Sequence, residues 1–129
     1  MLISGLIAAL YVRVCNLSEY DMGVQLKNNA STTVPLSVSS TDTSLTVLSG
    51  TGTRFPELGA SDFFYATIQD VSNNFEIVKV TARTDDIMTI VRAQESTLAI
   101  PFPANSRFEL RVTAQNLSQV IESLDFLLL

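Results

Sequence analysis

The chain has 129 residues, of which 47% are hydrophobic and 16% are charged, and its formal net charge is −5 at pH 7. This length suits one domain with a real core, and the composition is that of a globular protein rather than a disordered tail. The acidic balance argues against nucleic-acid binding, and the absence of histidine excludes Ser-His and Cys-His catalytic pairs and every histidine-containing metal site within one chain.

Residues 1–21 form an apolar N-terminal extension that carries no charge before Arg13. A membrane span needs ~20 apolar residues and a signal peptide needs a basic start, so we expect neither. Cys15 is the single cysteine, which rules out an internal disulfide, and we expect it to be a small buried hydrophobic residue. Met22 follows an acidic break, and we hypothesise that translation in the native host starts there. An intact mass that includes residues 1–21 would refute this hypothesis.

The segment from residue 24 to residue 61 gives weak strand signals. Residues 24–48 are rich in Ser, Thr and Asn, and only Ser44–Leu48 clearly predicts a strand. Gly50-Thr51-Gly52 resembles part of a phosphate-binding loop, but that motif needs a Gly-Lys-Ser/Thr ending. Arg54-Phe55-Pro56 follows instead, so we expect a loop that connects two strands.

Residues 62–92 predict an antiparallel meander of three strands. Short polar turns at Asn73-Asn74 and Asp85-Asp86 separate three stretches of β-type residues, and Asn and Asp favour such turns. The three predicted strands are residues 63–69, 75–82 and 87–91.

Consecutive aromatic residues at the start of this meander, Phe63, Phe64 and Tyr65, are candidate interaction residues. Neighbouring residues of a strand point to opposite faces, so at least one ring covers the core and another covers the opposite side. That second side is either a docking face or the second half of a sandwich core.

The C-terminal part predicts one more strand and an amphipathic helix. In Arg107–Thr113, alternation places Phe108, Leu110 and Val112 inward, and Thr113 is a plausible N-cap for a helix over residues 114–129. We expect its apolar face to pack against its own sheet rather than against another copy, because the stripe is too short to fix a coiled coil. That face consists of Leu117, Val120, Ile121, Leu124, Leu127 and Leu128, and the candidate interaction residues of the helix are Leu124, Phe126, Leu127 and Leu128.

The charged residues of the central region predict no catalytic or metal site. We expect four acidic residues to be solvated at strand ends or loops, and Lys79 to protect an edge strand from aggregation. No Asp-x-Asp-x-Asp-Gly calcium loop is present. We therefore predict no enzyme activity and no cofactor. The four acidic residues are Asp62, Asp70, Glu76 and Glu95.

Several short blocks between residues 27 and 113 together resemble a β-rich module of tailed-bacteriophage virion proteins. The most specific block is Glu76–Arg83, EIVKVTAR. The chain departs from the pattern at Ala93 and Ser96, where the module has glycines. The other matching blocks are Lys27–Ala30, Ser44–Val47, Gly50–Pro56, Asp62–Thr67, Thr89–Thr97 and Arg107–Arg111.

The resemblance implies a non-enzymatic structural protein located in the virion. A capsid cement or decoration protein, bound to the major capsid protein as a homo-oligomer, is our first expectation. A tail adaptor or tail-fibre anchor, bound to tail proteins, is the alternative, and a small carbohydrate-binding domain is a more remote one. From the residues alone we predict a mainly β fold over 22–113, an antiparallel meander in a small β-barrel or sandwich, with a C-terminal helix.

Overall fold

The computed structural model describes residues 23–128, and within the last helix it describes side chains as far as Glu122. The predicted extension 1–21, Cys15 and the proposed start at Met22 lie outside the described residues. The elements are β1 (Ser31–Val34), β2 (Ser44–Thr46), the 3-10 helix η2 (Gly52–Arg54), β3 (Phe64–Gln69), β4 (Phe75–Thr84), β5 (Ile87–Gln94), β6 (Ser106–Glu109) and α2 (Ala114–Leu128).

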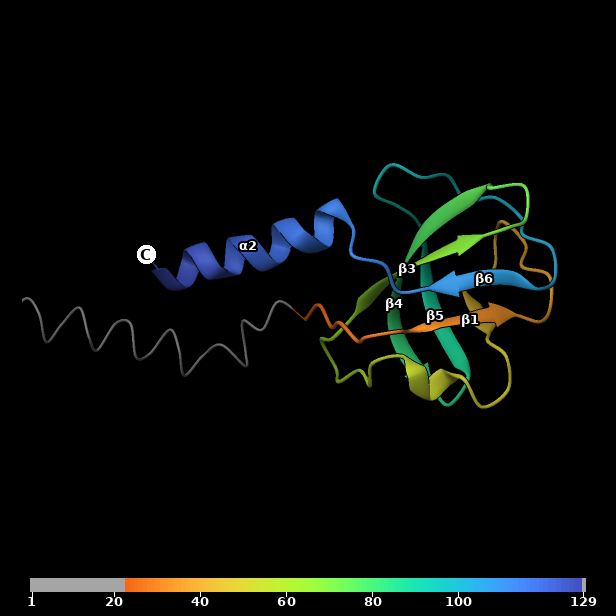
Figure 1. Cartoon of the computed structure of the whole chain (residues 1–129), viewed down its shortest axis with the longest axis horizontal. Coiled ribbons are helices and arrows are strands. Elements are labelled where there is room, and N and C mark those ends of the chain that lie inside the picture. The colour runs from red at the N-terminus through yellow and green to blue at the C-terminus, as the bar shows by residue number, and fades with distance from the viewer. Residues whose placement is uncertain (1–22, 129) are drawn as a thin grey trace, which may run out of the picture.

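All six strands belong to one antiparallel sheet in the order β1-β6-β3-β4-β5-β2, which curls into a half-barrel (Figure 1). The predicted mainly β fold with a C-terminal helix is therefore confirmed. The predicted meander is also confirmed, since β3 pairs with β4 and β4 pairs with β5. β1 forms in the segment where the sequence showed only weak alternation.

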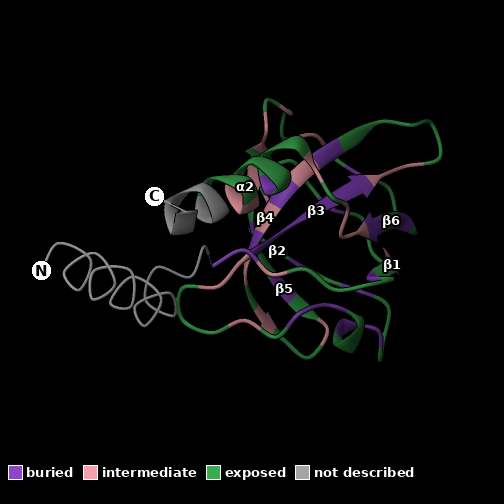
Figure 2. Ribbon diagram, turned by 60° about the vertical axis from the view of Figure 1, so that its left-hand side comes forward, coloured by how far each residue is buried: buried purple, intermediate pink, exposed green. Residues whose placement is uncertain are grey.

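The concave side of the sheet holds the hydrophobic core. Phe64 and Phe108 project into it from β3 and β6, and Phe55, just after η2, covers both, with ring centroids 5.7 Å and 5.2 Å away. Each such ring stabilises the fold by about 1.5–3 kcal/mol through burial. Figure 2 shows buried residues concentrated along the strands. Other buried members of the core are Ala66, Ile68, Val78, Val80, Met88 and Ile90.

Hydrogen bonds from the segment after β2 reach the edge strand β1. The amide of Leu48, just after β2, donates to the carbonyl of Thr33 in β1 at 2.9 Å, and Arg54 Nη1 donates to the carbonyl of Ser31 at 3.0 Å. The hydroxyl groups of Thr32 and Thr51 share a buried hydrogen bond of 2.7 Å. The edge strands β1 and β2 have only four and three residues, and strands this short are poor templates for an added strand.

The Gly50–Gly52 loop binds a carboxylate of the same chain. Asp86, in the turn between β4 and β5, accepts hydrogen bonds from the amides of Gly50 (2.9 Å) and Gly52 (2.8 Å). These amides lower the pKa of the Asp86 carboxyl. The loop thus serves to join the β2–η2 segment to the β4–β5 turn.

The last strand is shorter than predicted. β6 ends at Glu109, whereas the alternation predicted a strand to Thr113, and Val112, predicted to point inward, is 70% exposed. The strand ends early because the backbone leaves the sheet after Leu110. Leu110 still donates its amide to the carbonyl of Ala30 at 2.9 Å, and beyond it the backbone turns toward α2.

The cap of α2 is confirmed, but the predicted packing of the helix is wrong. The amide of Asn116 donates to Thr113 Oγ1 at 3.2 Å, as expected for an N-cap. The helix then extends away from the domain instead of lying on the sheet (Figure 1). Leu117 and Ile121 consequently remain 52% and 47% exposed.

The direction of α2 is set at its first turn. Glu95, in the loop after β5, accepts hydrogen bonds from Thr113 Oγ1 (2.7 Å) and from the amide of Gln115 (2.9 Å). This carboxylate lies where the partial positive charge of the helix favours an anion. In the described part of the chain, no helix is long and apolar enough to cross a membrane.

Candidate interaction surface

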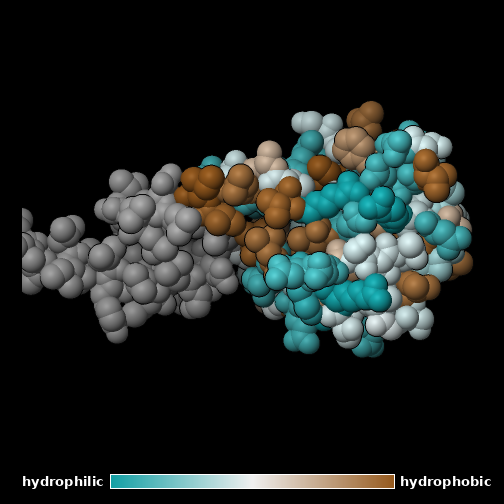
Figure 3. All heavy atoms as spheres, in the orientation of Figure 1, coloured by the Kyte–Doolittle hydropathy of each residue, from teal (hydrophilic) through white to brown (hydrophobic). Residues whose placement is uncertain are grey.

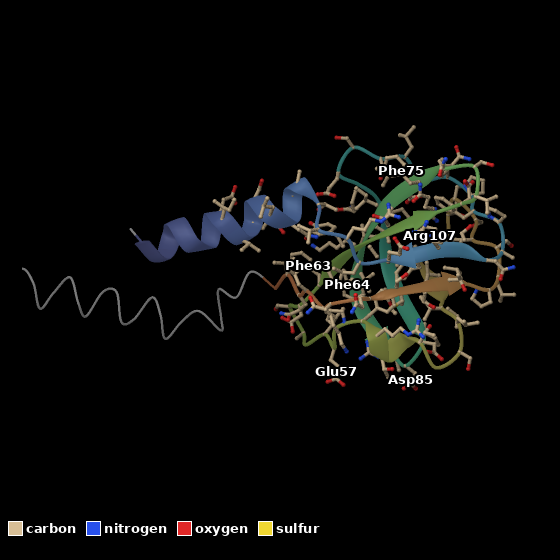
Figure 4. All side chains as sticks on the ribbon, viewed as in Figure 1. Glu57, Phe63, Phe64, Phe75, Asp85 and Arg107 are labelled. Carbon is tan, nitrogen blue, oxygen red and sulfur yellow. The ribbon has the colours of Figure 1, made fainter. Side chains whose placement is uncertain are left out.

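The three predicted aromatic residues divide between the two faces of β3. Phe64 is fully buried in the core, whereas Phe63 and Tyr65 lie on the convex side with ring centroids 5.6 Å apart at 80°. Figure 4 shows Phe63 near the end of the domain from which α2 leaves. Tyr65 is only 3% exposed, so it is not available as a surface residue.

Lys79 does not protect a sheet edge. It belongs to β4, which lies between β3 and β5, and it stands opposite Tyr65 on one neighbour and Val91 on the other. Its Nζ atom is 4.2 Å from the centroid of the Phe63 ring, a cation–π contact. The predicted edge position was therefore wrong, because the sequence does not reveal the order of strands in the sheet.

Glu76 is not a solvated strand-end residue. It lies within β4 and is fully buried, and its carboxylate accepts hydrogen bonds from Arg92 of β5 and from the amides of Ala93 (2.9 Å) and Ile100 (3.0 Å). Alternation already placed Glu76 on the same face as Val78 and Val80. An acidic residue on a buried face requires a buried partner, and this signal was missed.

Some of the exposed apolar residues that sequence reasoning missed lie where α2 joins the domain. Phe75 is 52% exposed, and beside it lies a shallow hollow of about 390 Å³ whose walls include Ile77, Arg111, Val112 and Thr113. Figure 4 shows Phe75 at the rim of the domain, and Figure 3 shows hydrophobic residues at the junction and along the described part of α2. We call Phe75, Ile77 and Val112 the root surface.

The root surface borders a group of paired charges on the convex face. Glu109 accepts hydrogen bonds from Arg107 Nη2 (2.6 Å) and Arg111 Nε (2.9 Å), and Arg111 Nη2 also donates to Gln69 Oε1 at 2.8 Å. Partial burial raises the pKa of Glu109, but the two arginines outweigh it and the net pKa is lowered. An apolar patch with a charged rim is typical of a protein interface.

The predicted helical candidates lie in α2, although their side chains are outside the described part. These are Leu124, Phe126, Leu127 and Leu128. They do not share the sheet face that carries Phe63. Across residues 23–128, no three Asp, Glu or Cys side chains are grouped as they would be to hold a metal ion.

Left-handed backbone occurs at the end of β5 and in the turn that follows it. Ala93, Glu95 and Ser96 have φ values of 55°, 50° and 64°. Residues with a side chain rarely adopt this conformation, which glycine adopts freely.

Comparison with known protein families and with curated proteins found no match to this chain.

Proposed function

We propose that this chain is a non-enzymatic structural protein of a tailed-bacteriophage virion, acting as a capsid cement or decoration protein bound to the major capsid protein. The resemblance of the blocks between residues 27 and 113 carries the proposal, and Glu76–Arg83 is its most specific block. A left-handed residue with a side chain costs about 1–2 kcal/mol, so glycine is the residue that such a turn favours. The backbone of Ala93 and Ser96 is left-handed, so this fold is compatible with glycine at the two positions where the chain departs from the module.

The surface of the domain fits this role. Its two edge strands have only four and three residues, so partners bind through faces and loops rather than by adding a strand. The root surface offers a half-exposed phenylalanine beside the charges of Glu109 and Arg111. Such a patch suits a subunit that becomes buried in a lattice.

A tail adaptor or tail-fibre anchor is the second candidate, and the position of α2 favours it. A helix that leaves the domain end-on provides a connection to a stalk, whereas a cement protein needs only its domain. Both candidates predict a homo-oligomer. A carbohydrate-binding role finds less support, since Tyr65 is buried and a Tyr65→Ala variant would test folding rather than binding.

Immunogold labelling of intact particles of the phage that encodes the chain tests the proposal. Label spread over the head supports the cement protein, and label confined to the tail supports the adaptor or anchor. Particles that carry no label, while the same antibody detects the purified protein, would refute a virion location. Pre-immune serum on the same particles is the control.

A further inference from the structure

We propose that α2 joins copies of this chain in a parallel helical bundle. The inference rests on the proposed function only for its setting, a homo-oligomer in a virion. Its tests use purified protein, so they can fail while the virion labelling succeeds, or the reverse.

The first step is that the exposed apolar residues of α2 need a surface to pack against. Isolated helices shorter than ~12–15 residues are marginal in water, and α2 has 15 residues. Within residues 23–128, the hydrogen bonds between α2 and the domain involve only its cap and first turn, at Thr113, Gln115 and Asn116. The half-exposed Leu117 and Ile121 beyond this turn therefore call for a partner.

The second step is that the apolar positions of α2 suit a copy of itself. Leu117, Ile121, Leu124 and Leu128 follow one another at intervals of four, three and four residues. This spacing is that of the a and d positions of a coiled coil, a seam that is complementary to an identical seam. No separate protein is needed to explain such a pattern.

The third step is the orientation. A stable interface buries roughly 800 Å² per partner, and a seam of two heptads is short for that purpose. Additional apolar area lies at the N-terminal end of α2, where Val112 is largely exposed and Phe75 flanks the hollow. Only a parallel arrangement brings these root surfaces of different copies together.

Leu117→Glu tests the seam, and Gln115→Glu is the matched control. Both substitutions place one negative charge in the first turns of the same helix, but Gln115 lies outside the a and d positions. We expect light scattering to give a mass of several chains for the native protein and Gln115→Glu, and one chain for Leu117→Glu. Equal masses for the two variants would overturn the proposal. Unchanged melting of the β domain in Leu117→Glu excludes global unfolding as the cause of dissociation.

A cysteine at the seam tests the orientation. In a Cys15→Ser background, Leu117→Cys places a thiol that meets its counterpart only if the helices run parallel. Mild oxidation should then give covalent dimers on a non-reducing gel, whereas Gln115→Cys should give few. An oligomer that does not cross-link through Leu117→Cys would overturn the parallel arrangement.

The apolar extension of residues 1–21 is the other segment that can pack on the apolar face of α2. In that case the native chain would have the mass of one copy, and the amides of α2 would still be protected from hydrogen exchange. That result would overturn the proposal. A protein starting at Met22 that keeps the mass of several chains would support it.

Discussion

The side chains of Glu76 and Arg92 form a bidentate ion pair inside the half-barrel, with Nε 2.7 Å from Oε2 and Nη2 2.8 Å from Oε1. Arg92 also donates to the carbonyls of Ile100, Ser39 and Asp42. The pair thereby ties β4 and β5 to two loops that lack regular structure. Because the pair is buried, its polar atoms need hydrogen-bond partners within the protein.

Removing one partner of this pair should be costly. Glu76→Gln leaves the guanidinium of Arg92 without its counter-charge, and breaking a buried pair in this way destabilises a protein by about 3–5 kcal/mol. Urea denaturation measures the loss. Glu57→Gln is the control. The Glu57 side chain is 95% exposed and comes no closer than 4.0 Å to Arg83, so we expect a change in the free energy of unfolding within about 0.5 kcal/mol. A similar small loss for both variants would contradict this assignment.

The same pair should make the protein sensitive to acid. Burial raises the pKa of Glu76, but hydrogen bonds from Arg92 and from the amides of Ala93 and Ile100 outweigh it, so the net pKa lies below the ordinary value of 4.5. A lowered carboxyl pKa stabilises the fold above the unfolded pKa, and this contribution is lost as pH falls through the folded pKa.

We therefore expect the Tm to change little between pH 7 and 5.5 and to fall below about pH 4.5. The Glu76→Gln variant should show a shallower fall, since it lacks the titrating group. Melting followed by circular dichroism across this pH range gives both curves. A Tm that rises on acidification, or an identical slope in the variant, would contradict the expected linkage.

Gly52→Ala should disrupt the loop that Asp86 holds. A Cβ atom at residue 52 would clash with the backbone carbonyl oxygen of Asp85, and the backbone cannot yield as a side chain can. We expect a loss of about 1–3 kcal/mol in the free energy of unfolding. At Gly59 the added Cβ would lie 3.1 Å from the flexible carboxylate of Asp62, so Gly59→Ala should cost less. Equal losses would argue against the close contact.

Glycine at the left-handed positions should stabilise the protein. Ala93→Gly and Ser96→Gly relieve about 1–2 kcal/mol of backbone strain each, and the added freedom of the unfolded chain offsets about 0.5–1 kcal/mol. A net gain of about 0–1.5 kcal/mol per site is expected by urea denaturation. Ala99→Gly, in the following loop where φ is not positive, should lower stability instead. Destabilisation by both glycines would contradict the expected relief of backbone strain.

Local patterns predicted the elements that depend on neighbouring residues. The meander of β3, β4 and β5 follows from alternation and from turns rich in Asn and Asp, and the cap at Thr113 follows from a side chain that bonds the amide three residues on. These features need no knowledge of distant segments.

The order of strands, the burial of charges and the position of α2 depend on contacts that are distant in the sequence. Lys79 was expected at an edge and lies in the centre, because strand order is a long-range property. Glu76 was expected in solvent and is buried, because its partner Arg92 lies sixteen residues away on the next strand. The sequence determined the β meander, the cap and an apolar face on the last helix. Only the tertiary structure decided that this face does not pack on the sheet, since the hydrogen bonds of Glu95 direct α2 away from the domain.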